Sequence, residues 1–471
     1  MLPNFDFWYI ILVVNQTKEM PMNIKKNDII NIDITGISSD GNGVGRFDGF
    51  AVFVPMTDVG DNVDVHVIKV TKNYAVGKIQ KIVAFSQNRC DNDCESYSKC
   101  GGCCFRHIAY EKEFEYKREY VASNMKRIGK LEIEVAPVVA CDYVQRYRNK
   151  AVYPVQKKDG KLQIGFFSKH SHRIVECDDC KLQPVVFSEI IAVLKEFFEI
   201  NNFSIYDEQS NSGVLKHIFL RKGAVTEEIM VCFVINADKL PMSDEIVSLL
   251  TQKFDSIKSI TININKSVGN AILSDKICTI YGEDVIKDIL CDVKLDISPL
   301  SFYQVNHNTA EKIYRKAAEI ASLNPDDILL DLYCGTGSIG LSMANRVKEL
   351  IGVEIIPQAI ENAKKNAANN DIQNARFICA DAKEAVKQLH KEGIRPTVVV
   401  LDPPRKGCDS SVIETVVSMK PQRIVMISCD SATLARDLSA FSEFGYHADT
   451  VIPHDMFPRT NHIECVTCLK I

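Results

Sequence analysis

The sequence lacks a strong excess of either charge. Its 471 residues include 56 Lys and Arg against 61 Asp and Glu, which gives a net charge of −5. Hydrophobic residues make up 46% and charged residues 25% of the chain. These values are typical of globular proteins and exclude wholesale disorder, collagen and coiled coil. The slightly acidic balance excludes nucleic-acid binding by bulk charge alone, but it permits local basic surfaces.

The chain also lacks an apolar run long enough to cross a bilayer. Phe5–Val14 is apolar but has about half the length that a membrane-spanning helix needs. No Lys or Arg precedes it and no small-residue cleavage site follows it, so it is not typical of a secretory signal. We therefore interpret residues 1–21 as a poorly ordered extension. We expect a cytoplasmic protein with no membrane partner that acts as a monomer.

Cysteine is too sparse for a disulfide scaffold, with 17 in the whole chain. Thiols stay reduced in a protein that is not exported, so clustered cysteines indicate metal binding or catalysis. One cluster contains Cys94, Cys100 and Cys103, and a pair, Cys177 and Cys180, follows much later in the chain. Four thiolates could hold zinc or an iron–sulfur cluster, and their spacing does not decide between the two.

The length predicts about three domains. Residues 22–84 contain short alternating segments separated by turn dipeptides such as Asp40-Gly41 and Asp48-Gly49, which predicts a small β-barrel of oligonucleotide-binding type. Residues 85–298 mix strands and helices without a repeat, and a helix at about 107–130 is expected to pack with the last domain. In residues 299–471 helices alternate with apolar strands, which predicts a doubly wound, Rossmann-like α/β domain.

A glycine-rich loop follows the first strand of this α/β domain. Strand Asp327–Tyr333 is followed by Gly335-Thr336-Gly337, and Glu354 ends the next strand. Early glycines let the backbone approach a ligand, and a carboxylate at Glu354 can accept two ribose hydroxyls, so NAD is one candidate ligand. Asp331, which precedes the loop, is instead similar to the first motif of S-adenosylmethionine-dependent methyltransferases. A purely structural loop is the remaining alternative.

Two later strands also end in chemically distinctive residues. One ends in Asp402-Pro403-Pro404, and the next ends at Ser428 just before Cys429. The carboxyl ends of strands are where open α/β sheets bind ligands. A helix is expected to begin at about Ser431, and its dipole favours a thiolate, so Cys429 is predicted to have a lowered pKa.

Five segments carry a resemblance to a known family. They are residues 301–306 (SFYQVN), 331–337 (DLYCGTG), 401–407 (LDPPRKG), 428–437 (SCDSATLARD) and 456–464 (MFPRTNHIE). Together they resemble the RNA uracil-5-methyltransferases, and the N-terminal barrel is similar to the TRAM domain, an RNA-binding module of that family. The resemblance extends over nearly the whole chain from about residue 22.

The resemblance implies roles for individual residues. Cys429 corresponds to the nucleophile that adds to uracil C6, and Glu464 to the base that removes the C5 proton. The residues implied to contact S-adenosylmethionine are Gln304, Tyr333, Glu354, Asp381 and Asp402. Asp402 is also a candidate to face the uracil.

The resemblance also bears on the cysteines and the substrate. The ribosomal branch of the family holds a [4Fe–4S] cluster with a similar cysteine spacing, which implies Cys94, Cys100, Cys103 and Cys180 as ligands and 23S rRNA as the RNA partner. The same chemistry on tRNA is one alternative. A catalytically silent RNA-binding or iron–sulfur protein is another, although the presence of Cys429 and Glu464 argues against it.

Overall fold

The structure is a computed structural model that describes residues 24–471. The predicted extension 1–21 lies outside the described residues. The chain divides into two compact units, and each is described by itself. The first contains the residues up to Tyr116 together with Arg459–Asn461, and the second contains Lys117–Pro458 and His462–Ile471. No helix among the described residues is long and apolar enough to cross a membrane.

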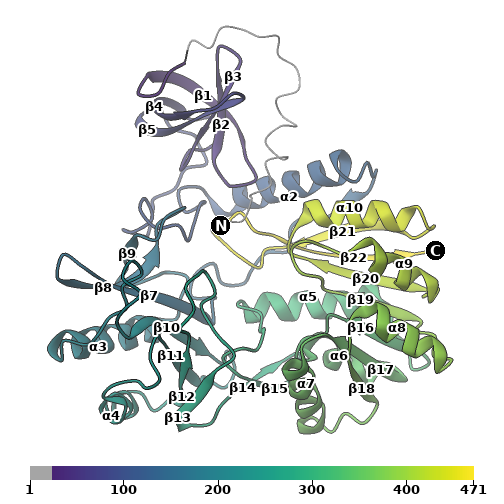
Figure 1. The fold of residues 1–471 in the computed structure, drawn as a ribbon. Coiled ribbons are helices and arrows are strands. Elements are labelled where there is room, and N and C mark those ends of the chain that lie inside the picture. Colours follow the sequence, from purple (N-terminus) through teal and green to yellow (C-terminus); the bar gives the residue numbers. More distant parts are fainter. Residues whose placement is uncertain (1–23) are drawn as a thin grey trace. The chain divides into compact units, whose positions relative to one another are not determined.

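The first unit contains a closed five-stranded barrel, which confirms the predicted N-terminal fold (Figure 1). Its strands are listed in chain order as β1 (Ile29–Ile37), β2 (Gly43–Phe47), β3 (Phe50–Val54), β4 (Asn62–Val70) and β5 (Tyr74–Ala84). Asp48 and Gly49, both with positive φ, form the two-residue turn between β2 and β3. Gly77 is required on β5, because a Cβ atom there would lie 2.0 Å from a methyl group of Val65.

The second unit contains two large sheets and one two-stranded sheet. The smaller of the two large sheets has seven strands in the order β13-β12-β11-β10-β7-β8-β9. Its strands are β7 (Lys150–Lys158), β8 (Lys161–Phe167), β9 (Ile174–Glu176), β10 (Leu215–Lys222), β11 (Ile229–Ile235), β12 (Ile257–Ile264) and β13 (Ile277–Gly282). Helices α3 (Val185–Ile200) and α4 (Ser243–Lys253) pack on it through a core that includes Phe187, Leu194 and Leu250.

The larger sheet has eight strands in the order β18-β17-β16-β19-β20-β22-β21-β6. Its strands are β6 (Glu134–Val135), β16 (Ile328–Leu332), β17 (Glu349–Glu354), β18 (Ala375–Cys379), β19 (Val398–Leu401), β20 (Arg423–Ser428), β21 (His447–His454) and β22 (Glu464–Lys470). The five strands from β18 to β20 in this order run parallel to one another. β22 is antiparallel to both β20 and β21. The strand order reverses between β16 and β19, and ligands bind at such a point in open α/β sheets.

Helices cover both faces of this sheet (Figure 1). They are α2 (Tyr110–Arg127), α5 (His307–Ile320), α6 (Ser338–Met343), α7 (Pro357–Asn369), α8 (Ala382–Lys391), α9 (Ser410–Ser418) and α10 (Ser431–Ser442), with a short 3₁₀ turn at Ala344–Arg346. A hairpin of β14 (Ile286–Leu290) and β15 (Val293–Ile297) precedes α5. Within the second unit, Val121 and Met125 of α2 join the core under α8, α9 and α10.

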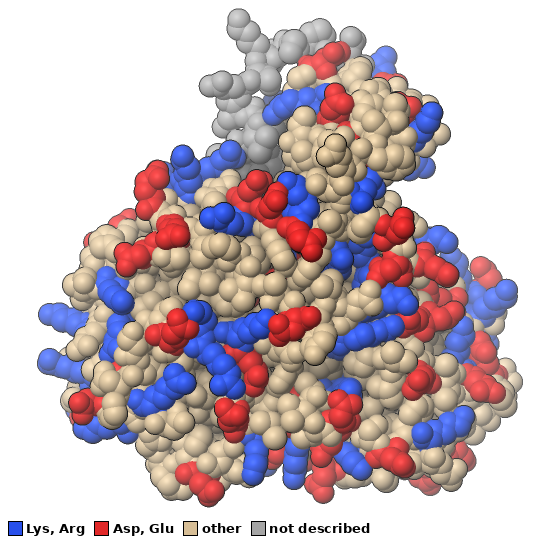
Figure 2. Space-filling model, turned by 180° about the vertical axis from the view of Figure 1, so that it is seen from behind, with Lys and Arg blue, Asp and Glu red and all other residues tan. Residues whose placement is uncertain are grey.

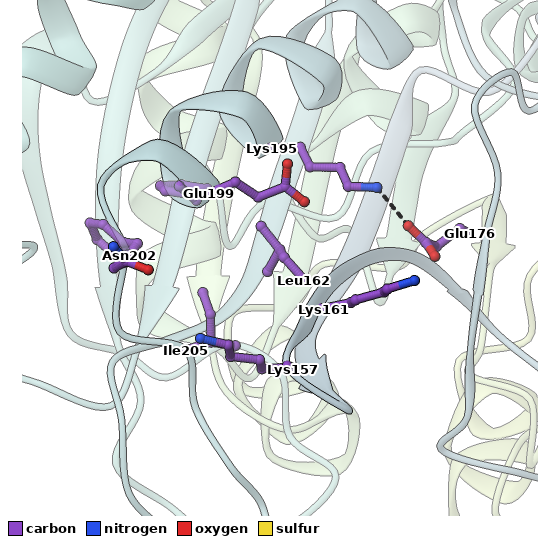
Figure 3. Close-up of a pocket in the computed structure, with 11 residues that line it drawn as sticks. Lys157, Lys161, Leu162, Glu176, Lys195, Glu199, Asn202 and Ile205 are labelled. Atoms are coloured by element: carbon purple, nitrogen blue, oxygen red, sulfur yellow. Dashed lines mark hydrogen bonds and ion pairs between the residues drawn. The ribbon is translucent and has the colours of Figure 1, made fainter.

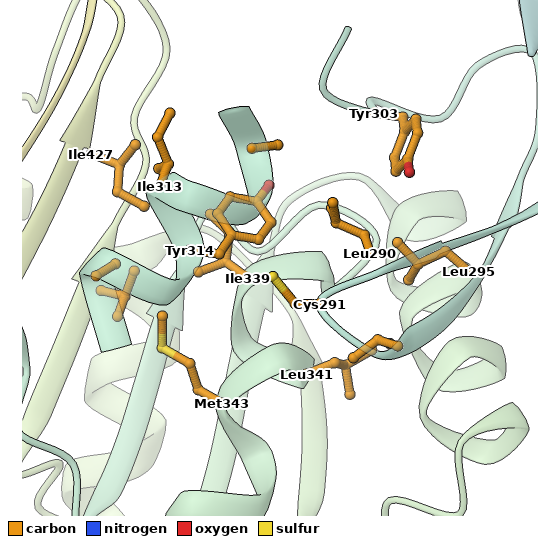
Figure 4. Packing of buried hydrophobic residues seen from close by; sticks show 14 of the residues in the cluster. Leu290, Cys291, Leu295, Tyr303, Ile313, Tyr314, Ile339, Leu341, Met343 and Ile427 are labelled. Carbon is orange, nitrogen blue, oxygen red and sulfur yellow. The ribbon is translucent and has the colours of Figure 1, made fainter. Parts of the chain in front are cut away.

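The central strands are buried on both faces, which explains their unbroken apolar sequences. In β19, Val398 and Val400 face the core beneath α5 and α6, while Val399 and Leu401 face the opposite core. Figure 4 shows the first of these cores, where Tyr314 of α5 packs near Ile339 of α6. The two cores fix the carboxyl ends of the strands, from which the candidate site residues project.

Candidate active site

The loop after β16 has a backbone shaped for close approach. Tyr333, Gly335 and Gly337 have φ angles of 67°, 54° and 84°. Such values are strained for Tyr333 but accessible to glycine. A Cβ atom on Gly335 would meet nothing within 4 Å, so the space beside its backbone is open. The loop therefore leaves main-chain atoms accessible to a ligand at the carboxyl end of β16.

Asp331 is a buried acid immediately before this loop. One carboxylate oxygen accepts a hydrogen bond of 2.9 Å from the backbone N–H of Gly340. The other, Oδ1, is buried and has no hydrogen-bond partner within residues 24–471. Burial raises the pKa of Asp331 to about 8. A buried oxygen without a partner is costly, which points to a donor that a ligand supplies.

Glu354 and Asp381 follow the next two strands outward. Glu354 ends β17 and accepts hydrogen bonds from the backbone N–H groups of Gly335, Ile355 and Ile356, at 3.3, 2.8 and 3.1 Å. Asp381 lies two residues beyond β18 and caps α8 by accepting a 2.9 Å bond from Glu384 N–H. The capping bond gives Asp381 a structural role, whereas Glu354 adjoins the glycine loop directly.

Gln304 belongs to the segment that enters α5. Its side chain hydrogen-bonds the Tyr314 hydroxyl, which also lies 3.3 Å from Ser338 Oγ at the start of α6. The Gln304 carbonyl accepts a 2.8 Å bond from the side-chain amide of Asn149. These contacts connect Gln304, through Tyr314, to the start of α6 just after the glycine loop, and its role as a cofactor contact stays a prediction.

Asp402 is a further acidic residue at this edge of the sheet, beyond the point between β16 and β19 where the strand order reverses. It follows β19, and burial raises the pKa of its carboxyl to about 7. Its charge acts on Asp331 and on the Tyr314 hydroxyl, so these groups lie close together. S-adenosylmethionine carries an ammonium, a sulfonium and a carboxylate, and an edge of Asp331, Glu354 and Asp402 with an open glycine loop fits a nucleoside with these two cationic groups.

Cys429 and Glu464 meet at the next two strands. Cys429 follows β20, and Glu464 begins β22. The β20–β22 ladder pairs Ser428 with Cys465, so its antiparallel continuation brings Cys429 opposite Glu464. Asp430, next to Cys429, caps α10 by accepting 2.9 Å bonds from the N–H groups of Ala432 and Thr433. This cap fixes the turn that presents the thiol.

The expected lowering of the Cys429 pKa is wrong for the protein alone. Burial raises the pKa of the thiol to about 12, and the charge of Glu464 raises it further, while Arg405 acts in the opposite direction. Burial also raises the pKa of Glu464 well above its usual value, and the charge of Asp402 raises it further. Desolvation and neighbouring carboxylates outweigh the dipole of α10.

Arg405 is a functional candidate that the sequence reasoning did not assign. It is exposed on the loop that carries Asp402, and its charge favours the ionised forms of both Cys429 and Glu464. Its position in the same loop as Asp402 was the available signal. The sequence does not show that β22 pairs antiparallel with β20, so it could not reveal that Glu464 lies near Arg405.

The predicted iron–sulfur ligands are not confirmed by the structure. Within residues 24–471, no three His, Cys, Asp or Glu side chains are grouped as ligands of a metal ion would be. The iron–sulfur cluster therefore stays a prediction. In the first unit, Cys103 Sγ accepts a 3.4 Å hydrogen bond from Arg106. In the second, the side chains of Cys177 and Cys180 are hydrogen-bonded to each other.

A separate hollow of about 460 Å³ lies beside β7, β8 and α3 (Figure 3). Lys157, Lys161 and Glu199 contribute to its lining, and Lys195 forms a 2.6 Å ion pair with Glu176 at its edge. It shares no residue with the predicted cofactor or catalytic set. The candidate active site is therefore the edge of the larger sheet.

Comparisons with known proteins show which family the chain belongs to. The family model described as tRNA (Uracil-5-)-methyltransferase matches residues 109–471, and the TRAM domain model matches residues 25–79. An uncharacterized RNA methyltransferase of Clostridium tetani is 41% identical over 95% of this chain and 97% of its own length. One of Bacillus cereus is 39% identical over 96% and 99%.

A solved structure is similar over the same extent. The Pyrococcus abyssi tRNA (uracil-54, C5)-methyltransferase, in complex with S-adenosyl-L-homocysteine, has a TM-score of 0.75 and 29% identity, covering 93% of this chain and all of that one. The fold is that of an S-adenosylmethionine-dependent methyltransferase with an N-terminal TRAM barrel. The chain belongs to the RNA uracil-5-methyltransferase family, which confirms the resemblance predicted from its motifs.

Proposed function

We propose that this enzyme methylates C5 of a uridine in 23S rRNA through a covalent adduct between Cys429 and uracil C6. The observation that carries this proposal is the placement of Cys429 opposite Glu464, beside the acidic edge and the glycine loop. Uracil C5 is too weak a nucleophile to take a methyl group without activation. A thiol and a carboxylate facing one another provide the two groups that an addition–elimination sequence requires.

The proposed sequence begins at Cys429. Its Sγ, after losing a proton, forms a bond to C6, and the C5=C6 electron pair moves to give an enolate. S-adenosylmethionine would supply an electrophilic methyl group, to which C5 would form its new bond as the bond between that methyl group and the cofactor sulfur breaks and S-adenosyl-L-homocysteine is left. Glu464 then accepts the proton from C5, the C5=C6 double bond re-forms, and the bond from Cys429 to C6 breaks. The proton that leaves the Cys429 thiol passes to solvent and is regained when the thiolate is released. The C5 proton held on Glu464 then passes to solvent, so one proton is released for each methyl group transferred.

Gln304, Tyr333, Glu354, Asp381 and Asp402 are the residues that we propose to hold the cofactor. Glu354 accepts a hydrogen bond directly from Gly335 in the glycine loop, whereas Gln304 hydrogen-bonds Tyr314, whose hydroxyl lies 3.3 Å from Ser338 Oγ just after the loop. The neighbouring Tyr333 side chain is half-buried. Asp402 lies between this region and Glu464, whose pKa it raises. Asp381 has the weakest support, because its carboxylate already caps α8.

The choice of ribosomal RNA rests on the cysteine spacing alone. If Cys94, Cys100, Cys103 and Cys180 hold a [4Fe–4S] cluster, the chain is similar to the ribosomal branch of the family. The tRNA alternative is favoured by a different observation, the similarity to the Pyrococcus abyssi tRNA (uracil-54, C5)-methyltransferase. We further propose a monomer acting in the cytoplasm, with the domain division 22–84, 85–298 and 299–471.

Mapping of 5-methyluridine decides the substrate. Ribosomal RNA and tRNA are purified from cells with and without the gene, digested with nuclease and analysed by mass spectrometry. A uridine in 23S rRNA should lose its methyl group without the gene and regain it with the wild-type gene but not with a Cys429→Ser gene. Loss confined to tRNA would refute the ribosomal assignment, and no loss in either RNA would refute the proposed function.

A further inference from the structure

We propose that one face of β8 binds a single-stranded segment of the RNA substrate, through cations at one end and an aromatic platform at the other. The proposal rests on the proposed function, because it assigns a contact for the same RNA. The β8 face is defined by Lys158, Lys161 and Phe167, with Lys169 and Arg173 in the following turn. None of these residues belongs to the candidate active site.

Register puts the three defining side chains on one face. β8 begins at Lys161 and ends at Phe167. Side chains alternate along a strand, so residues six positions apart point the same way, and the two lie roughly 20 Å apart. Lys158 of β7 pairs directly with Lys161. Gly165, which lies between Lys161 and Phe167 on β8, has no side chain. Its neighbour on β9, Glu176, forms an ion pair with Lys195 (Figure 3).

The pairing of Lys158 with Lys161 is unfavourable in the protein alone. The two residues flank a two-residue turn of Asp159 and Gly160, both with positive φ, which fixes their register. Like charges directly opposite each other on neighbouring strands destabilise a sheet. Both side chains are exposed, and neither forms an ion pair within the described residues. An anion bound between them would relieve the repulsion.

Unneutralised positive charge is concentrated in this stretch. Residues 157–173 contain five Lys and Arg but one acidic residue, Asp159, in a chain whose net charge is −5. Elsewhere in the same sheet region, cations such as Lys181, Lys222 and Lys266 are held in ion pairs. Figure 2 shows Lys and Arg interspersed with Asp and Glu over one face of the molecule. Free cations bind a phosphate backbone by displacing its counterions.

The far end of the face carries an exposed aromatic stack. Phe167 is 39% exposed, and its ring stacks on His172 with centroids 5.4 Å apart and an interplanar angle of 24°. His172 is held by a 2.9 Å contact with Glu208, and Arg173 donates a hydrogen bond to Ser168. Exposed aromatic rings beside cations are the platform on which unpaired bases stack.

The occupant that fits is single-stranded RNA rather than a duplex. A duplex presents its phosphates but keeps its bases stacked on each other, so it would leave the Phe167 ring unused. Sequence-specific RNA enzymes act on loops and unpaired segments, whose bases are available for stacking. The proposed segment therefore flanks the target uridine or lies in a loop near it.

The test measures RNA affinity without cofactor, so that it does not depend on methyl transfer. Full-length Phe167→Ala and the double variant Lys158→Ala/Lys161→Ala are compared with wild type by filter binding to an unpaired RNA and to a duplex of equal length. The matched controls are Phe444→Ala, which removes a ring that is 47% exposed, and Lys239→Ala/Lys253→Ala. Unchanged affinity for S-adenosyl-L-homocysteine shows that each variant is folded.

Phe167→Ala should weaken binding of the unpaired RNA by at least about fivefold and leave duplex binding nearly unchanged. The lysine double variant should lower the slope of log affinity against log salt by about one to two. Cross-linking of 4-thiouridine RNA should label the peptide that contains Phe167. If both variants match their controls in affinity and salt slope, the proposal is overturned even if the enzyme methylates uridine normally.

Discussion

Cys429 and Glu464 face each other across the ladder between β20 and β22. β22, which pairs antiparallel with the last of the parallel strands, thus returns a carboxylate to the strand end that carries the thiol. Glu464 makes ionisation of Cys429 harder, because it adds negative charge to a site that is already desolvated. The pair is therefore suited to a reaction in which charge moves onto a substrate rather than resting on the enzyme.

The first prediction concerns the nucleophile. Cys429→Ser should reduce methyl transfer to RNA by at least about 10³-fold, because a hydroxyl is a much weaker nucleophile than a thiolate at neutral pH. Cofactor affinity should change little, since the predicted cofactor residues lie on other strands. Transfer from radiolabelled cofactor and cofactor affinity by calorimetry are measured in parallel. The exposed Cys278→Ser serves as control, and comparable turnover in the two variants would exclude covalent catalysis by Cys429.

The second prediction separates the two roles. Glu464→Gln should permit addition and methyl transfer but block removal of the C5 proton, so the RNA should stay bonded to Cys429. An RNA–protein band should then survive denaturing electrophoresis. The double variant Cys429→Ser/Glu464→Gln should give no such band, and the exposed Glu414→Gln should behave as wild type. Multiple turnover by Glu464→Gln would show that another group is the base.

The third prediction follows from the raised pKa values. Both Cys429, with a pKa of about 12, and Glu464, whose pKa is raised well above its usual value, must lose a proton before they act. The fraction of each in its active form therefore grows with pH. The logarithm of the single-turnover rate should rise with pH from 6.5 to 9 with a slope of about one or more. A rate that is flat above pH 7 would indicate that bound RNA lowers these pKa values first.

The strands of the larger sheet could be predicted because short motifs follow several of them. The predicted strand Asp327–Tyr333 contains β16, and the strand ends predicted at Glu354 and Ser428 are those of β17 and β20. Asp331, Asp402 and Cys429 each follow or end an apolar run, so their place at the carboxyl edge could be deduced from the sequence. The two-residue turns of the barrel likewise indicated its hairpins.

The relation between Cys429 and Glu464 could not be deduced in this way. It depends on β22 returning antiparallel between β20 and β21, a long-range pairing that local sequence does not encode. The same limit applies to charge. The helix dipole at Cys429 is a local property, but the burial and the neighbouring carboxylates that raise its pKa come from other strands.

The fourth prediction concerns the cysteines. Protein purified without oxygen should contain about four iron and four sulfide per chain if Cys94, Cys100, Cys103 and Cys180 hold a cubane cluster. Cys180→Ser should lose iron, and its sequence neighbour Cys177→Ser should retain it. Metal analysis and the visible spectrum measure both. A colourless protein, or stoichiometric zinc, would exclude the cluster and remove the support for ribosomal RNA.

The fifth prediction links Asp402 to stability. Burial raises the pKa of its carboxyl from 3.8 to about 7 in the folded protein. Between these values the folded state keeps a proton that the unfolded chain has released, so stability falls as pH rises through this window and the loss is complete above pH 7. Asn at this position stays neutral at every pH and avoids the loss.

Asp402→Asn should therefore match wild type in thermal stability near pH 4 and exceed it at pH 8 by about 1–4 kcal/mol. Its methylation activity should fall sharply, because Asp402 is proposed to contact cofactor and uracil. Calorimetric melting from pH 4 to pH 8 measures the difference, and Asp326→Asn, an exposed residue of the same domain, is the control. A wild type that is more stable than Asp402→Asn at pH 8 would mean that the carboxylate is ionised and paired in the folded enzyme.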